Sequence, residues 1–214
     1  MSTTTVYPST ADGYLTSGSD VSYATARSGG AVQEIHNTAN DMWVAQRRKG
    51  DDSDPYYYCY SGYLDFDTSS IPDTDEISAV TLSLHAIDFY GTPGALEVYA
   101  YDWGKELTFA DWIAGADVAA MTLLASYPGT WSGGAYRALT SETAFKAAIN
   151  KTGVTRLFLC TTNFRTGSAP SDEDGYTFYA TEKGTTYRPK LVIEHAAAAG
   201  VPKHSDYYRR RRAA

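Results

Sequence analysis

The stretch YLDFDTSSIPDTDEISAVTLSLH, residues 63–85, most limits what this chain can fold into. Its first end, LDFD, and its second end, VTLSLH, alternate apolar and polar residues, and a period of two places the two kinds on opposite faces of a sheet. The middle, residues 68–76, is rich in serine, threonine and acids and contains a proline, which predicts a loop. The stretch therefore predicts two half-buried strands joined by a polar connector.

The pattern also predicts the placement of three individual residues in or beside this stretch. Ile71 is the apolar exception in the connector, and we expect it to pack beneath the sheets. Gly62 interrupts the strand that begins at Tyr56, and a glycine inside a strand predicts a β-bulge. His85 falls on the face opposite the leucines, where we expect it to meet solvent and to have a surface or structural role.

The remaining chain repeats this pattern of short strands and turns. Further strands are expected over residues 12–17, 31–37, 41–49, 56–60, 86–90, 96–101, 121–127, 154–162, 176–181 and 189–194. One helix is expected over residues 141–150, because Phe145 and Ile149 stand one turn apart on a common stripe. Thr140 or Ser141 is its expected cap, and Gly153 its end.

These elements predict an all-β fold, a jelly-roll β-sandwich with one short helix and extended arms at both ends of the chain. Residues 1–11 are expected to form the N-terminal arm, residues 12–195 the sandwich and residues 196–214 a basic C-terminal tail. A chain of 214 residues buries a sufficient core without disulfide or metal staples. Cys59 and Cys160 are therefore expected to be buried free thiols, with a disulfide open as the alternative.

Tyrosine is the most unusual component of the composition, with 18 residues in the chain. Tyrosine and tryptophan combine an apolar ring with a polar tip, and an exposed ring can stack on the apolar face of a sugar. The same residue types are enriched where subunits meet. The sequence therefore leaves two interpretations open, glycan contact or subunit contact, for Trp43, Tyr56, Tyr58, Tyr60, Tyr99, Tyr101 and Trp103. The tyrosines at 56, 58 and 60 would join those at 99 and 101 in one patch if their strands were neighbours.

Two acidic turns are candidate cation sites, since Ca²⁺ takes six to eight oxygen ligands from such loops. The candidate ligands are Asp51, Asp52, Asp54, Asp172 and Asp174. Neither turn has the glycine offset of an EF-hand, and charged solvated loops at the ends of a β-sandwich are the alternative.

Motifs of catalysis are missing from the sequence. It contains no Gly-x-Ser-x-Gly, His-Glu-x-x-His, P-loop or Gly-x-Gly-x-x-Gly pattern, and its four histidines are scattered. Because no nucleophile and no acid–base pair converge, we expect a protein that is not an enzyme.

Charge is distributed unevenly along the chain. The net charge is −7, yet residues 201–214 hold five cations and a single carboxylate. Such asymmetry predicts a partner for the basic end, an acidic surface that docks it through charge-assisted pairs. Nucleic acid is the disfavoured partner, because few cations stand on an acidic body, and a solubilising end is the further alternative. The docking residues would be Tyr207, Tyr208, Arg209, Arg210, Arg211 and Arg212.

Several short motifs resemble the DNRLRE-domain proteins, which include the family 96 carbohydrate-binding modules. The matching segments are ADGY at 11–14, LDFD at 64–67, SSIP at 69–72, TLSL at 81–84, Val98-Tyr99, the Trp103–Trp112 loop and RPKLVI at 188–193. The resemblance spans residues 11–195 and departs from the family at Asp65, where the family has arginine. It implies a non-catalytic jelly roll that is often extracellular and associated with glycans.

Taken with the amino terminus, these features lead to a functional expectation. The first residues have neither the basic start nor the apolar core of a secretion signal, so we expect synthesis in the cytoplasm without a signal peptide. No run of about 18 apolar residues predicts membrane insertion. We expect a structural or decoration protein of a phage-type virion surface or tail, forming a homo-oligomer, holding other subunits through its terminal arms and binding host glycans in adhesion. A stand-alone extracellular carbohydrate-binding module, with Ca²⁺ as a cofactor, is the alternative.

Overall fold

The computed structural model of the protein describes residues 1–30, 32–51 and 53–198. Its strands are β1 (Ser2–Val6), β2 (Gly13–Ser19), β3 (Val32–His36), β4 (Asp41–Lys49), β5 (Tyr56–Asp67), β6 (Asp75–Tyr90), β7 (Leu96–Ala100), β8 (Leu123–Tyr127), β9 (Tyr136–Ala138), β10 (Thr140–Ser141), β11 (Val154–Thr161), β12 (Glu173–Tyr179) and β13 (Lys190–Ala197). The helices are α1 (Tyr23–Arg27), α2 (Ala144–Ala148) and α3 (Thr162–Thr166), with short 3-10 turns η1 (Phe109–Asp111), η2 (Asp117–Ala120) and η3 (Thr181–Lys183). None of the described helices is long and apolar enough to cross a membrane.

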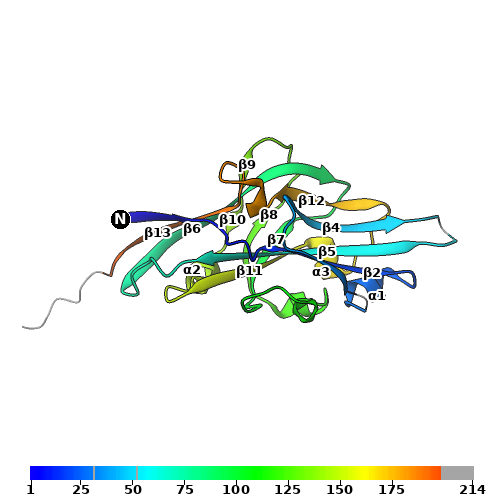
Figure 1. Ribbon diagram of the computed structural model, residues 1–214, viewed down its shortest axis with the longest axis horizontal. Coiled ribbons are helices and arrows are strands. Elements are labelled where there is room, and N and C mark those ends of the chain that lie inside the picture. Colours follow the sequence, from blue (N-terminus) through cyan, green and yellow to red (C-terminus); the bar gives the residue numbers. More distant parts are fainter. Residues whose placement is uncertain (31, 52, 199–214) are drawn as a thin grey trace, which may run out of the picture.

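The strands form one curled antiparallel sheet in the order β1-β13-β6-β12-β4-β5-β11-β7-β8-β10. Its two halves face each other, and the main core between them takes residues from both, such as Leu82 on β6, Phe178 on β12, Leu157 on β11 and Val98 on β7. Figure 1 shows the resulting elongated body, with β1, β6 and β13 toward one end and β2, β4 and β5 toward the other. The predicted all-β sandwich of jelly-roll type is confirmed.

Strand β5 connects the two halves at Gly62. Residues 56–60 of β5 pair with β4, whereas residues 62–67 pair with β11 on the same edge. A Cβ atom at position 62 would lie 2.9 Å from Met42 Sδ and 3.0 Å from Val44 Cγ2. The predicted bulge is wrong, because the pairing of β5 with β2 runs through this position without a register shift. Glycine is needed there because a side chain would overlap those of Met42 and Val44.

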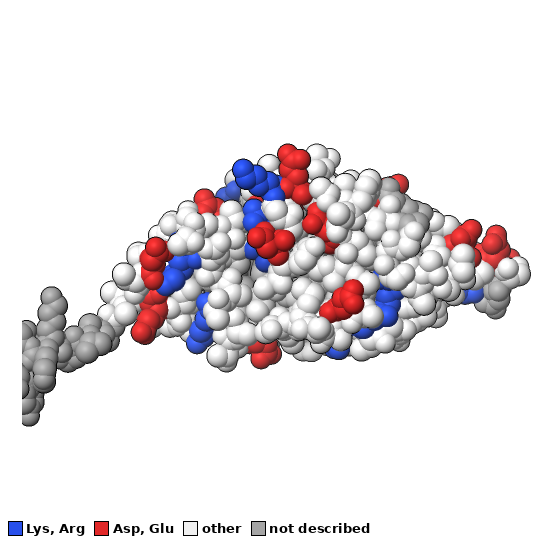
Figure 2. Space-filling model, turned by 90° about the horizontal axis from the view of Figure 1, so that it is seen from below, with Lys and Arg blue, Asp and Glu red and all other residues white. Residues whose placement is uncertain are grey.

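A second core covers the opposite face of β5, β11 and β7. Tyr63, Phe158 and Tyr99 project from these strands and pack beneath α1 and the loop that carries Trp103 and Ile113. This loop is the green segment beneath the sheet in Figure 1, and Figure 2, seen from that side, shows acidic and basic side chains interspersed among uncharged ones. Cys59 and Cys160 lie in this core as buried free thiols, as predicted.

The predicted helix over residues 141–150 is shorter in the structure than expected. The helix α2 spans only Ala144–Ala148, although Phe145 and Ile149 reach the core as predicted. Ser141 does not cap it, because its hydroxyl donates to the carbonyl oxygen of Val80 as part of the β10 edge. The 3-10 turns and the helices α1 and α3 were not predicted, because segments so short carry no periodicity.

The predicted N-terminal arm, residues 1–11, begins as an extended strand that lies on the sheet. Strand β1 pairs with β13 over Ser2–Val6, which extends the sheet to the N-terminus. Buried beside this pairing, His195 accepts or donates one hydrogen bond to Thr4 Oγ1 at 2.9 Å and contacts Asp75 Oδ2 at 2.7 Å. Ile71 packs into the main core with 1% of its surface exposed, which confirms the expected plug.

Candidate functional site

At the margin of the main core, one face of the sheet carries aromatic side chains on four adjacent strands; Tyr14 belongs to that core, and Trp43 and Tyr60 pack against it. Pairing of β4 with β5 sets Arg47 opposite Tyr58, and pairing of β2 with β5 sets Thr16 opposite Tyr60. Strand β3 continues the row, with His36 opposite Tyr14. Opposed residues in an antiparallel pair share a face, so these side chains all project to the same side.

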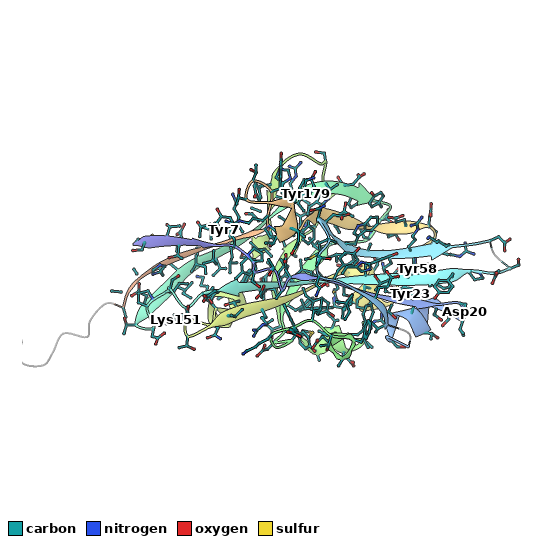
Figure 3. All side chains as sticks on the ribbon, in the orientation of Figure 1. Tyr7, Asp20, Tyr23, Tyr58, Lys151 and Tyr179 are labelled. Carbon is teal, nitrogen blue, oxygen red and sulfur yellow. The ribbon has the colours of Figure 1, made fainter. Side chains whose placement is uncertain are left out.

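Between them lies a hollow of about 360 Å³, which we name the aromatic trough. Its lining residues are Tyr14, Thr16, Glu34, His36, Trp43, Arg47, Tyr58 and Tyr60. In Figure 3, Tyr58 is labelled on the β4–β5 end of the molecule. Because rigid strands supply nearly every lining residue, the shape of the trough is set by sheet register and not by a loop.

The rings of the trough contact one another in a continuous series. Tyr58 and Tyr60 have ring centroids 6.3 Å apart, and those of Tyr60 and Trp43 are 5.9 Å apart. Trp43 in turn stacks on Tyr90 of β6, with centroids 5.9 Å apart and planes 10° from parallel. Mutual packing of this kind restricts the rotamers of half-buried rings, so this face is ordered without a ligand.

Polar groups fix the same rings from their edges. Trp43 Nε1 donates to Asp41 Oδ2 at 2.9 Å, which holds the indole plane. His36 stacks on Tyr14 with centroids 4.2 Å apart, and its Nε2 lies 3.0 Å from Glu34 Oε2. The trough therefore offers flat apolar surfaces bordered by carboxylate and imidazole groups.

Two polar side chains of the trough have unused hydrogen-bonding capacity. Arg47 Nε lies 3.4 Å from Glu173 Oε2, a distance and angle that form an ion pair without a hydrogen bond. Thr16 Oγ1 is buried and has no partner among the described residues. Buried polar atoms without partners are costly in a folded protein. A ligand hydroxyl reaching these two atoms would satisfy both.

Two phenols of the trough, those of Tyr14 and Tyr60, are neutral at physiological pH. Burial raises the pKa of Tyr14 to about 12, with smaller contributions from the charges of Asp41 and Glu34. Burial likewise raises the pKa of Tyr60 to about 12. A phenol with a raised pKa holds its proton, so it serves as a hydrogen-bond donor and is a poor general base.

The predicted aromatic contact residues divide into two groups. Tyr56 extends the trough series, with its ring centroid 4.7 Å from that of Tyr58. Tyr99 and Trp103 are buried in the second core, at 3% and 4% exposure, and Tyr101 packs against it. The condition for a single patch is not met, because β11 lies between β5 and β7, which are therefore not neighbours. Tyr99 is held internally, its hydroxyl donating to Glu97 Oε2 at 2.8 Å.

The candidate metal ligands are engaged in local structure. Asp51 Oδ1 accepts hydrogen bonds from Ser53 N and Oγ and from Asp54 N, and the Ser53 bonds lower the pKa of this carboxyl. Asp174 is buried and accepts from Thr92 N at 2.7 Å, while Asp172 is exposed at the start of the following strand. Asp52 lies outside the described residues. Within residues 1–30, 32–51 and 53–198, no group of three or more His, Cys, Asp or Glu side chains is placed to hold a metal ion.

The predicted docking residues of the tail, Tyr207, Tyr208 and Arg209 to Arg212, also lie outside the described residues. Conversely, the trough contains residues that sequence reasoning did not select: Tyr14, Thr16, Glu34, His36, Arg47 and the adjacent Tyr90. The alternation of residue types predicts which face of each strand is exposed. It does not predict which strands are neighbours, and the pairing of β2, β3 and β6 is what brings these side chains together. Comparison with protein-family models gives no match to this chain, and comparison with curated proteins gives none either.

Proposed function

We propose that this protein is a non-catalytic display subunit of a larger assembly, of the phage virion surface or tail kind, that binds glycans in the aromatic trough. The observation that carries the proposal is the trough itself, a concave series of ordered rings with polar groups at their edges. It supports binding rather than chemistry, because its two buried phenols are held neutral and the imidazole of His36 is engaged by stacking on Tyr14 and by the Glu34 carboxylate.

A sugar ring fits both chemical characters of the trough. The axial C–H groups of a pyranose form a flat apolar face that packs on Trp43, Tyr58 or Tyr60, as aromatic faces pack on one another. Its hydroxyl groups then reach Thr16 Oγ1 and the Arg47 guanidinium, which lack hydrogen-bond partners of their own at these atoms. A subunit interface is the competing use of such a surface, but interface cores are depleted in charge, whereas this hollow contains the charged side chains of Glu34 and Arg47.

Strand β1, at the end of the body away from the trough, supports the proposed assembly. Strand β1 is an edge strand of uncharged residues, STTTV, with one side paired to β13 and the other unpaired within the described chain. Edge strands of this kind readily pair with another chain unless a charge, a proline or a bulge protects them. The trough lies toward the other end (Figure 3), so an assembly held through β1 would leave the trough accessible.

A glycan array probed with the full chain tests the binding function. Trp43→Ala should weaken binding at least about tenfold, because it removes the central ring of the series. The matched control is Tyr101→Ala, which removes a half-buried aromatic ring from the other face. A Trp43→Phe variant, which keeps a ring in place, should retain most of the binding and thereby separates ring loss from misfolding.

The array and a size measurement together separate the alternatives. An array without any hit, or a Trp43→Ala protein that binds like the wild type, would refute glycan binding in the trough. Light scattering should give a defined oligomer that dissociates when residues 1–6 are deleted. A monodisperse monomer would refute the assembly part and leave the stand-alone carbohydrate-binding module as the conclusion.

A further inference from the structure

A second aromatic cluster lies on the same face of the sheet, where β6 pairs with β9, β12 and β13. Its centre is His85, whose ring centroid lies 5.0 Å from that of Tyr136, 5.4 Å from that of Tyr179 and 4.9 Å from that of Tyr187. His85 does project opposite the leucines, as predicted, but these phenol rings cover it and leave only 8% of its surface exposed. The expected contact of His85 with solvent is therefore wrong.

Three cations surround this cluster. Lys190 Nζ lies 4.1 Å from the ring centroid of Tyr136, and Lys183 Nζ lies 5.1 Å from that of Tyr179. The guanidinium of Arg188 lies 3.8 Å from the ring centroid of Tyr7. Together with the three phenol rings around His85, these cations form what we name the basic aromatic patch.

The patch carries cations that make their contacts with aromatic rings and not with carboxylates. None of its three cations forms an ion pair with a described carboxylate. Two carboxylates lie near by and face other groups: Asp41 accepts from Trp43 Nε1, and the charge of Glu182 acts on the buried Asp12. Contacts with ring faces orient a cation but leave its charge in place. On a chain with net charge −7, such a local excess is a specific feature.

A buried imidazole gives a second, independent indication of a ligand. His85 Nδ1 is inaccessible to solvent and has no hydrogen-bond partner within the described residues. Arg188 Nε is in the same condition. Cations and a nitrogen without a partner, set beside aromatic rings, are complementary to an anionic group carried on a ring that has an apolar face.

We propose that the basic aromatic patch binds the carboxylate or sulfate group of an acidic glycan. An acidic glycan fits better than nucleic acid, because three cations match the sparse charge of a uronic acid or sulfated sugar. A phosphate backbone requires a broad positive field, which an acidic body does not provide. The tyrosines then pack on sugar rings, as the rings of the trough do.

The patch and the trough are distinct but adjacent. Strand pairing sets Tyr179 of the patch opposite Asp41, two residues before Trp43 of the trough. Figure 3 places Tyr179 over the middle of the body and Tyr58 toward one end. This inference extends the proposed function, because it assigns the acidic class to a glycan long enough to run from the trough across β4 and β12 to the patch.

Calorimetric titration of the full chain with polygalacturonate, dextran sulfate and uncharged dextran tests the proposal. Lys183→Gln/Lys190→Gln should weaken binding of at least one charged polymer by about a hundredfold, since each of the two lost charge-assisted contacts contributes about a factor of ten. The control Lys105→Gln/Lys146→Gln removes the same charge from exposed lysines elsewhere and should leave binding unchanged. Lys183→Arg/Lys190→Arg keeps the charge and should keep the affinity. The two charged polymers distinguish carboxylate from sulfate as the recognised group.

The C-terminal arginines require their own control, because they would attract any polyanion. Changing Arg209 to Arg212 into glutamine should leave most of the binding intact. The proposal is overturned if that change abolishes binding, if the Lys183→Gln/Lys190→Gln protein binds like the wild type, or if single-stranded DNA competes as well as the polysaccharides. Loss of polygalacturonate binding in the patch variant, combined with an empty neutral glycan array, would support the patch while refuting the trough.

Discussion

Asp12 makes the stability of this protein dependent on pH in an unusual direction. Its carboxyl group is fully buried at the start of β2 and accepts two hydrogen bonds from Thr181, at 3.3 Å from N and 3.1 Å from Oγ1, both on Oδ2. Its Oδ1 atom has no partner among the described residues. Burial, followed by the charge of Glu182, raises the pKa of Asp12 from 3.8 to about 8. The folded protein therefore holds this proton through the neutral range.

The sign of the effect follows from which state binds the proton. Between pH 4 and 8 the unfolded chain has released the proton of Asp12 and the folded chain has kept it, so raising the pH favours unfolding. The free energy of unfolding should fall by about 1.4 kcal/mol per pH unit over this range. The total loss reaches on the order of 5 kcal/mol, a large part of the usual stability of a domain.

The substitution Asp12→Asn isolates the contribution of Asp12 protonation to the pH dependence of stability. An asparagine Oδ1 accepts both hydrogen bonds from Thr181, and its amide resembles the protonated acid without titrating. Urea unfolding at pH 5, 6, 7, 8 and 9 should show wild-type stability falling with pH, and the variant should lack that slope. The variant's stability relative to the wild type should therefore rise by several kcal/mol across the series.

Asp67→Asn is the matched control for the pH series. Asp67 is exposed, and hydrogen bonds from Ser69 lower the pKa of its carboxyl. A lowered pKa gives stability that is lost only as the pH falls below about 4, outside the range measured. Equal slopes for wild type and Asp12→Asn between pH 5 and 8 would refute the reasoning about Asp12.

Two further predictions concern the fold. Gly62→Ala should lower the free energy of unfolding by about 1–3 kcal/mol in urea titrations, because the new methyl group overlaps Met42 and Val44. Gly129→Ala should leave the free energy of unfolding unchanged, since the added Cβ meets only Tyr127, at 3.8 Å. An equal loss of stability in both variants would refute the close-packing explanation. Thr4→Val should cost about 1–3 kcal/mol by leaving His195 Nε2 without its partner, and hydrogen exchange of Ser2–Val6 should accelerate. The exposed Thr3→Val is the control, and unchanged exchange in the Thr4 variant would show that the bond does not hold β1 in place.

The alternation of residue types was sufficient to predict the fold class and much of the core. Leu64 and Phe66, like Leu82 and Leu84, lie in the main core because a period of two requires one face of each strand to be buried. Ile71 was identified by being apolar in a polar connector. Such inferences succeed because they depend only on the residues within one segment.

Only the tertiary structure decided which exposed faces meet and which are covered. Tyr58 and Tyr99 show the same alternation in sequence, yet one lines an open trough and the other lies beneath the loop that carries Trp103. The sequence predicts an exposed His85, but in the folded protein tyrosines from three other segments pack against its ring. A strand's own sequence specifies its two faces, but strand order and crossing loops place neighbours against them, and those depend on contacts between residues far apart in the chain.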